Sequence, residues 1–249
     1  MRLLLTNDDG VNSKGIYTLA KELQKEHEII IAAPSIEMSA KSHSITIAKP
    51  LFIKEVELDG INATTYSISG TPADCVKVAM DKILDKPVDM VISGINYGTN
   101  LGIDILYSGT VSAAIEAAIH NIPSIAMSAE VKNGDINFDT AASIARELVK
   151  ISQENSMKGN LVLNVNVPCL DKDSLKGLKV CQMGGRTFTS YFEKIEKNKE
   201  VSYMLKGELT NNHKPTTDIH FLRKGYTTIT PLHYDLTNFK IMNDVSNWF

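Results

Sequence analysis

The sequence has few cysteines, no basic excess and no long apolar run, and each absence excludes a class of protein. Three scattered cysteines (Cys75, Cys169 and Cys181) form no CxxC pair, so we expect reduced thiols rather than a disulfide framework. The net charge of -3 predicts no basic surface for a nucleic acid polymer. No segment approaches the ~20 apolar residues that span a bilayer.

Several targeting and nucleotide motifs are absent as well. The N-terminal apolar run is cut short by acids, and no small-residue cleavage site follows it. We therefore expect a cytoplasmic protein with no membrane attachment. The chain contains no GxxxxGKS or GxxxxGKT loop, no GxGxxG after the first strand and no HExxH-like histidine pair. The first two absences argue against Walker-type triphosphate hydrolysis and against dinucleotide binding, and the third removes the histidine pair typical of a zinc site.

Strand-like and helix-like patterns alternate over the first two thirds of the 249 residues. The predicted strands are 2–6, 28–33, 88–93, 123–128 and 161–167. The predicted helices between them are 13–26, 72–85, 109–121 and 138–153. Strands separated by helices predict crossover connections, and therefore an α/β fold with a mainly parallel sheet covered by helices on both faces.

Two regions depart from this alternation. Residues 43–69 are predicted as β-structure, with strands at 44–47, 51–53 and 65–68 and a turn at Asp59-Gly60. After about residue 170, short strands are predicted at 178–183, 187–193, 201–206 and 218–222. We interpret these as projecting hairpins that pair with another subunit. The chain is thus expected to form one domain, with an α/β core over about 1–170 and a β-rich extension over about 171–249.

The first strand runs directly into two acids, Asp8 and Asp9. Open α/β sheets bind ligands beyond the carboxyl ends of their strands. Adjacent carboxylates repel each other unless a cation lies between them, and hard oxygen ligands select Mg²⁺, Mn²⁺ or Ca²⁺. The pair therefore indicates a divalent metal site. The alternative is an ordinary turn in which Gly10 supplies a positive φ and an aspartate caps the next helix.

The segment 93–102 contains three glycines and two asparagines at the end of another predicted strand. Such a loop is costly in regular structure and is typical of backbone shaped around a ligand. Asn96 offers an amide oxygen to a hard cation. If its strand is a neighbour of the first, Asn96 lies near Asp8 and Asp9.

A helix is predicted to begin at Ser108-Gly109-Thr110. The free N–H groups and the dipole of a helix start favour phosphate, and two hydroxyls add donors. An ordinary N-cap has the same residues. In the loop after the second strand, Ser39 offers an oxygen to a metal. Lys41 and His43 are candidates for phosphate binding or proton transfer, although ordinary polar loop roles are favoured for each.

Two further segments are weaker candidates. Thr71 and Pro72 fit the cap and first turn of a helix, which is a structural role. His233 is a weak general-acid candidate, and a plain surface role is favoured for it.

These segments together resemble the SurE family of 5′-nucleotidases. The motifs LLLTNDDG, APSIEMSAKSHSIT, SGTPADCV, VISGINYGTNLG, YSGTVSAAIEAA and TDIHFLRKGYTTITPLHYDLTN occur in order along nearly the whole chain. The resemblance implies a three-layer α/β/α sandwich with a Rossmann-like sheet, and a C-terminal extension exchanged between subunits of a homodimer or homotetramer. It further implies one divalent cation per subunit, Mg²⁺ or Mn²⁺, held by four residues: Asp8, Asp9, Ser39 and Asn96. Ser108, Gly109 and Thr110 would face the phosphate. Ala40 stands where the family usually has glycine, and alanine disfavours a positive φ.

The expected reaction is hydrolysis of nucleoside 5′-monophosphates, with 3′-nucleotides and short polyphosphate as further candidate substrates. Attack by water is favoured over attack by an aspartate, because Gly10 occupies the position where haloacid-dehalogenase enzymes carry a second acid. One rival is a response-regulator receiver, but Ser93-Gly94 stands where a phospho-accepting aspartate would be needed. The other rival is a nucleotide-binding protein without catalytic activity.

Overall fold

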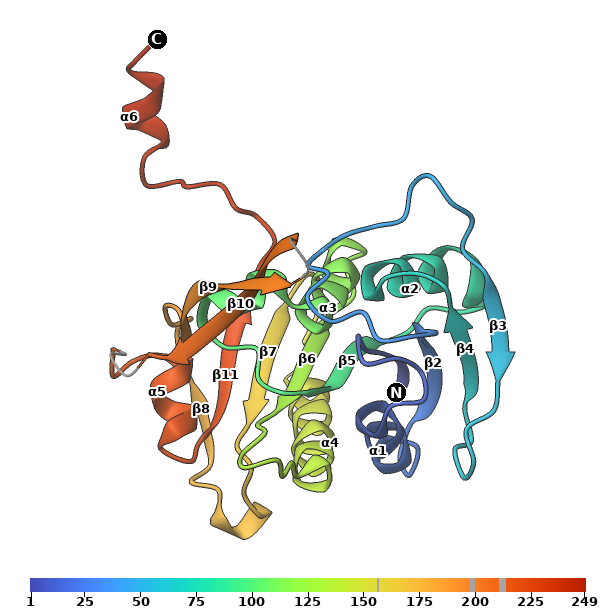
Figure 1. The fold of residues 1–249 in the computed structure, drawn as a ribbon. Coiled ribbons are helices and arrows are strands. Elements are labelled where there is room, and N and C mark those ends of the chain that lie inside the picture. The colour runs from blue at the N-terminus through green and yellow to red at the C-terminus, as the bar shows by residue number, and fades with distance from the viewer. Residues whose placement is uncertain (156, 198–199, 211–213) are drawn as a thin grey trace.

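In the computed structural model, a nine-stranded sheet forms the centre of the part of the chain that is described, residues 1–155, 157–197, 200–210 and 214–249. The strand order is β3-β4-β2-β1-β5-β6-β7-β11-β8 (Figure 1). Six consecutive strands of this order are parallel: β4 (Thr64–Ile68), β2 (Glu28–Pro34), β1 (Arg2–Thr6), β5 (Met90–Tyr97), β6 (Ser124–Ala129) and β7 (Val162–Val167). Their carboxyl ends therefore meet at one edge.

Three shorter additions complete the sheet. On one side, β3 (Ile53–Val56) pairs antiparallel with β4. On the other side, β11 (Thr227–Leu232) pairs antiparallel with β7, and β8 (Leu178–Val180) pairs parallel with β11. The sheet thus incorporates part of the C-terminal third of the chain.

Helices cover both faces of the sheet (Figure 1). On one face lie α1 (Lys14–Leu23) and α4 (Phe138–Glu154), and on the other lie α2 (Pro72–Val78) and α3 (Gly109–Ile119). A π-helical turn, Ala79–Ile83, continues α2, and a 3₁₀ turn, Gly102–Tyr107, precedes α3. Successive side chains of β1 alternate between faces: Leu3 and Leu5 pack with α1 and α4, and Leu4 packs with α2 and α3.

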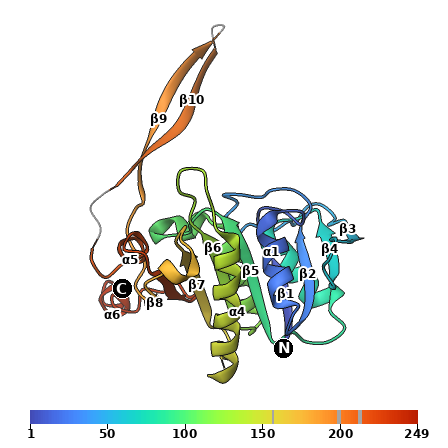
Figure 2. The ribbon, with the colours of Figure 1, turned by 90° about the horizontal axis from the view of Figure 1, so that it is seen from below.

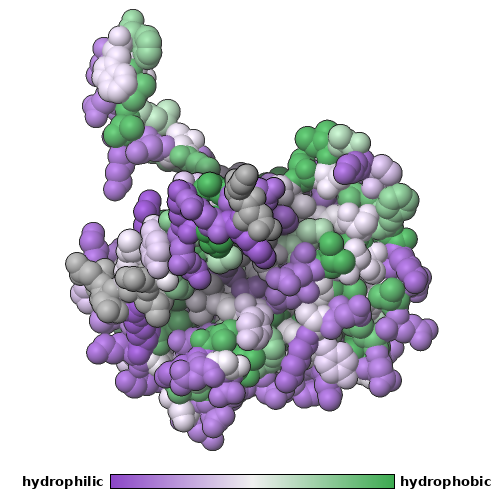
Figure 3. Space-filling model, viewed as in Figure 1, coloured by the Kyte–Doolittle hydropathy of each residue, from purple (hydrophilic) through white to green (hydrophobic). Residues whose placement is uncertain are grey.

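The rest of the chain projects from this body. Figure 2 shows a hairpin, β9 (Phe188–Lys197) with β10 (Glu200–Leu209), extending well beyond the sheet. A C-terminal arm ending in α6 (Met242–Ser246) extends separately and carries apolar atoms on its surface (Figures 1 and 3). Exposed apolar side chains of the hairpin include Phe192 and Leu205, and those of the arm include Leu236 and Trp248.

The predicted α/β class and the parallel core are confirmed, and three local predictions are wrong. Residues 44–47 form no strand, because Thr46 bonds through its N–H and hydroxyl to the Asp74 carboxylate instead of to a neighbouring strand. The segment 178–183 was expected to project, but β8 lies in the central sheet. The segment 218–222 is helical as part of α5 (Asp218–Arg223), because Thr217 accepts the N–H of His220 as an N-cap. No helix within the described ranges is long and apolar enough to cross a membrane.

A buried carboxylate connects α5 to the centre of the molecule. Asp218 is 0% exposed and accepts backbone N–H groups of Gly102, Gly184 and Ile219, each at 2.8 Å. These bonds join the start of the 3₁₀ turn before α3 to the C-terminal third of the chain. Buried N–H groups left without an acceptor are destabilising, so the Asp218 carboxylate is expected to contribute strongly to stability.

We predict that Asp218→Ala lowers the free energy of unfolding by about 3 kcal/mol or more, because three buried N–H groups lose their acceptor. Urea unfolding measures the change. Asp173→Ala removes an exposed carboxylate and serves as the control, with an expected change within about 0.5 kcal/mol. Equal losses in the two variants would show that the Asp218 bonds do not stabilise this fold.

Candidate functional site

Asp8 and Asp9 lie at the carboxyl end of β1, in a turn fixed by Asn7. The amide of Asn7 donates to the carbonyl of Gly10 at 2.9 Å and to the hydroxyl of Ser13 at 2.8 Å. These two bonds tie the turn to the start of α1. Asp8 is only 4% exposed, whereas Asp9 is partly exposed. The acids therefore sit on a rigid support at the ligand-binding edge of the sheet.

The buried acid is docked against the beginning of α3. The hydroxyl of Thr110 donates to Asp8 Oδ1 at 2.5 Å, and the backbone of Thr110 also helps to lower the pKa of this carboxyl. Gly109 permits the approach, since a Cβ there would lie 2.8 Å from the Cβ of Asp8 and 3.0 Å from its Oδ2. The helix start predicted to face phosphate therefore also holds the first aspartate.

Asp9 contacts the segment that carries Asn96. Strands β1 and β5 are neighbours, as expected, with Thr6 opposite Ser93. The backbone N–H of Tyr97 donates to Asp9 Oδ2 at 2.9 Å. Asn96 itself donates its amide N–H to the carbonyl of Gly98 at 2.8 Å. That bond leaves the amide oxygen, the atom a hard cation binds, unused.

The loop that carries Ser39 is held at the same edge of the sheet by the neighbouring residue, Met38. The N–H of Met38 donates to the backbone carbonyl of Asp8 at 2.7 Å, which brings the loop after β2 against the first aspartate. The hydroxyl of Ser39 donates to Glu37 at 2.8 Å. The charge of Glu37 in turn helps to raise the pKa of Asp9, so this acid lies close to the predicted metal ligands. Sequence reasoning assigned Glu37 no role.

The carboxylates lie in an environment that disfavours two negative charges. Burial raises the pKa of Asp8 to about 6, and the charge of Asp9 adds to the rise, while the bond from Thr110 opposes it. Burial also raises the pKa of Asp9. A divalent cation removes this repulsion, so the donor set fits such an ion. No group of three or more His, Cys, Asp or Glu side chains suited to a metal occurs among the described residues, so two carboxylates together with neutral oxygen ligands are the donor set that this edge offers.

The structure gives the predicted phosphate-binding residues definite local roles. The hydroxyl of Ser108 accepts the N–H of Val111 at 3.1 Å, which makes it the N-cap of α3, the alternative noted for it. The hydroxyl of Thr110 is used by Asp8. Anion binding at this helix start would therefore depend on backbone N–H groups, the helix dipole and the Ser108 hydroxyl, which accepts from Val111 and can still donate, rather than on the Thr110 hydroxyl.

The remaining residues considered in the sequence analysis are either exposed or bonded in other parts of the structure. Lys41 and His233 are exposed. His43 bonds to Glu116 at 2.8 Å. Thr71 and Asp74 form the capping box of α2, as the structural interpretation of that segment predicts.

A buried polar network holds the glycine-rich loop in place, and sequence reasoning missed it. Asn100 donates its N–H to Asn166 at 2.8 Å and its amide to Ser128 at 2.8 Å. Its carbonyl accepts from Asn164 at 2.9 Å and from Asn166 at 3.0 Å. Two alternating asparagines within the otherwise apolar strand VLNVNV were the available signal, because buried amides need partners.

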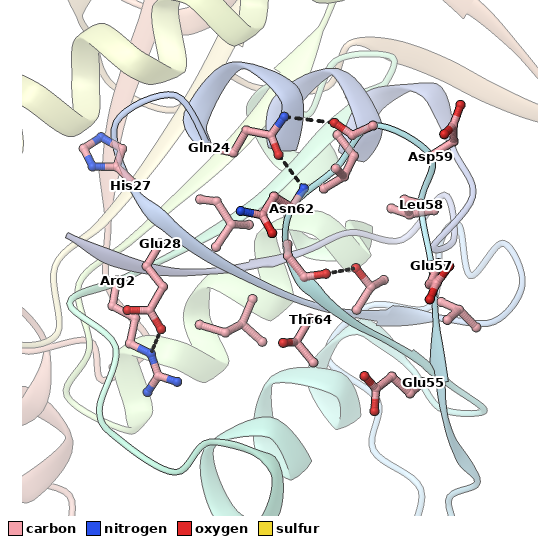
Figure 4. Close-up of a pocket in the computed structure, with 17 residues that line it drawn as sticks. Arg2, Gln24, His27, Glu28, Glu55, Glu57, Leu58, Asp59, Asn62 and Thr64 are labelled. Carbon is pink, nitrogen blue, oxygen red and sulfur yellow. Dashed lines mark hydrogen bonds and ion pairs between the residues drawn. The ribbon is translucent and has the colours of Figure 1, made fainter.

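A wide cavity lies at the opposite edge of the sheet (Figure 4). This hollow of about 1070 Å³ is lined by Arg2, Glu28 and Thr64 at the starts of parallel strands, and by acids such as Glu57 and Asp59. An apolar hollow of about 560 Å³ lies beside His43, His233 and the beginning of the C-terminal arm. Neither cavity is lined by Asp8 or Asp9, so cavity size does not identify the candidate functional site.

The family described as survival protein SurE matches residues 3–190 of the chain. A protein named 5′-nucleotidase SurE from Clostridium botulinum (strain Alaska E43 / Type E3) is 46% identical over 251 residues, covering 100% of both chains. One of the same name from Clostridium kluyveri is 49% identical over 253 residues, covering 100% of this chain and 99% of the other. A crystal structure of SurE protein from Aquifex aeolicus superimposes with a TM-score of 0.89 at 37% identity, covering 100% of this chain and 99% of that one. With a family match over most of its length and relatives that align with it from end to end, the chain belongs to the SurE family.

Proposed function

We propose that this chain is a 5′-nucleotidase, a divalent-metal-dependent phosphomonoesterase that converts nucleoside 5′-monophosphates to nucleoside and phosphate. The observation that carries the proposal is the buried carboxylate of Asp8, held at the start of α3 beside Asp9. The full-length relatives named 5′-nucleotidase SurE support the reaction. An acidic pair beside a helix N-terminus suits a substrate that brings both a phosphate and a cation.

In this proposal Asp8, Asp9, Ser39 and Asn96 hold one divalent cation per subunit, Mg²⁺ or Mn²⁺. The raised pKa of Asp8 and the unused amide oxygen of Asn96 support this assignment. When bound, such a cation polarises a phosphoryl oxygen and lowers the pKa of a coordinated water. Because they hold this cation, Asp8 and Asp9 are the catalytic carboxylates of the site.

The backbone at Ser108, Gly109 and Thr110 stabilises the negative charge that spreads over the phosphoryl oxygens. Thr110 also orients Asp8 through its hydroxyl. We favour water as the nucleophile, because Gly10 leaves no second acid where an aspartyl-phosphate enzyme needs one. The substrate is a nucleoside monophosphate. Phosphate recognition of this kind also admits 3′-nucleotides and short polyphosphate as secondary substrates.

The function is tested by phosphate release from 5′- and 3′-monophosphates of each base and from short polyphosphate, with Mg²⁺, with Mn²⁺ and with EDTA. We expect release that requires a divalent cation and favours 5′-monophosphates, because in this proposal both the cation and the helix start bind the phosphate. Undiminished release in EDTA would refute metal dependence. Tight binding of a nucleotide without release under any condition would favour the non-catalytic alternative.

We predict that Asp8→Asn abolishes phosphate release and stabilises the metal-free protein at pH 8. Folding raises the pKa of Asp8, so at pH values above that pKa the ionised carboxylate lowers the free energy of unfolding. The neutral amide of asparagine removes this effect and is expected to add about 1–3 kcal/mol to the free energy of unfolding. Asparagine keeps an oxygen that can accept from Thr110.

Urea unfolding and a phosphate assay measure these two effects, with the exposed Asp173→Asn as control. Mn²⁺ is expected to raise the melting temperature of the unaltered protein and not that of Asp8→Asn. Full activity in Asp8→Asn would refute the metal site.

We also propose that the chain is a single domain whose β-rich extension, from about residue 171, serves subunit exchange in a homodimer or homotetramer. Exposed apolar side chains on β9 and β10 support this role. We place the protein in the cytoplasm, which its three unpaired cysteines support, with no membrane and no nucleic acid polymer as partner.

We predict that the double substitution Phe192→Glu with Leu205→Glu lowers the assembled mass to that of one subunit. These residues are cross-strand partners with exposed apolar side chains, and burying two new carboxylates in an interface is unfavourable. Light scattering after gel filtration gives the mass. Ser202→Glu adds charge to the opposite face of the same hairpin without removing apolar surface, and it is expected to retain the assembly. An unchanged mass in the double variant would remove the hairpin from the interface.

A further inference from the structure

One charged side chain interrupts the apolar sequence of α3. Glu116 occurs within the run GTVSAAIEAAI, and its side chain is 6% exposed. A carboxylate so far from water requires partners that supply positive charge or hydrogen bonds. Glu116 lies about two helical turns after Gly109, on the same helix whose start holds Asp8. None of the catalytic roles proposed above uses it.

Three basic side chains surround this carboxylate, and one of them comes from a distant loop. Lys77 on α2 lies 3.6 Å from Glu116 Oε1, and His120, one turn later on α3, lies 3.5 Å from it. His43 Nε2 lies 2.8 Å from Oε2, which is the only one of these contacts short enough for a strong hydrogen bond. The bond from His43 keeps the pKa of Glu116 below its usual range. An ionised carboxylate only accepts, so Nε2 of His43 is the donor.

His43 ends the loop segment 39–43, which begins with the proposed metal ligand Ser39. Upstream, the N–H of Met38 bonds to the carbonyl of Asp8. Downstream, Ser42 donates its N–H to the carbonyl of Tyr107 at 3.0 Å and its hydroxyl to the carbonyl of Leu106 at 2.7 Å. The segment is therefore fastened at both ends to elements of the site.

The backbone between these anchors is in an unfavourable conformation. Ala40 has φ +56° and Ser42 has φ +53°, both in the left-handed region that side chains with a Cβ avoid. The sequence raised the possibility that Ala40 reshapes this loop, and the structure instead keeps the left-handed turn. Such a conformation persists only where the surroundings enforce it.

We infer that Glu116, acting through His43, is a positioning residue that holds segment 39–43 in the conformation that presents Ser39 to Asp8 and Asp9. This inference rests on the proposed function, in which Ser39 is a metal ligand. One rigid helix then fixes two parts of the site: its start holds Asp8, and its third turn holds the loop that completes the cation ligands.

Two measurements that need no turnover test the inference. Free Mn²⁺, followed by electron paramagnetic resonance, reports cation affinity. The rate of trypsin cleavage after the exposed Lys41, with fragments identified by mass spectrometry, reports how firmly the segment is held. We expect His43→Ala to weaken Mn²⁺ binding about 10-fold and to speed cleavage by a similar factor, because loss of a group that orients a metal ligand typically costs 10- to 100-fold in affinity.

Four further variants separate this role from a general loss of stability. Glu116→Met, which removes the accepting oxygens at similar volume, is expected to act in the same direction as His43→Ala, and the two changes combined should be no worse than His43→Ala alone, because both remove one contact. His43→Gln, whose amide can still reach Glu116, should recover most of the affinity. The control is His120→Gln, which touches the same carboxylate but not the loop, and it should behave as the unaltered protein.

The inference is overturned if His43→Ala and Glu116→Met bind Mn²⁺ and resist trypsin as the unaltered protein does, or if His120→Gln reproduces their effects. His43 is partly exposed, so its substitution leaves the core intact, and the melting temperature of each variant verifies folding. If the unaltered protein released no phosphate, the proposed function would fail, while affinity and cleavage would still decide whether His43 holds the loop.

Discussion

Asp8 is a carboxylate almost entirely removed from water, and the arrangement around the edge of the sheet follows from the need to accommodate it. Burial raises its pKa to about 6 even though Thr110 donates to it. Only a glycine at position 109 allows the first turn of α3 to come so close. The start of α3 bonds to the Asp8 carboxylate, the loop at Met38 bonds to the Asp8 backbone carbonyl, and Asn7 ties the following turn to α1, so these elements meet at this one residue.

The parts of the site come from segments that are far apart in the sequence, and the parallel sheet brings them together. Adjacent parallel strands β2, β1 and β5 end at the same edge, which places their following loops side by side. The loop after β5 then needs support of its own, which Asn100 receives from Asn164 and Asn166 on β7 and from Ser128 on β6. Rigid support of this kind keeps ligand atoms in place before a ligand arrives.

Much of the fold was predictable because its signals are local. Alternating apolar strands and amphipathic helices gave the parallel core, and the acids after the first strand pointed to the ligand-binding edge. Long-range bonds escaped prediction. Asp74 captures Thr46 and keeps 44–47 out of the sheet, and β8 joins the sheet only through β11, far along the chain. The hydrogen bond between His43 and Glu116 joins residues 73 positions apart, so no local sequence pattern predicts it. For α5, the cap at Thr217 was present in the sequence and was overlooked in favour of a strand.

The hairpin of β9 and β10 has a consequence for how the molecule folds. Every residue of β9 is exposed, so the hairpin gains almost nothing from the core of its own subunit. Two strands paired in isolation are only marginally stable in water. The hairpin is therefore a part of low local stability, and its amide hydrogens should exchange with solvent far sooner than those of β1 or β5. The order of folding follows: the central sheet forms first, and the hairpin, which the core of its own subunit does not support, becomes ordered after it.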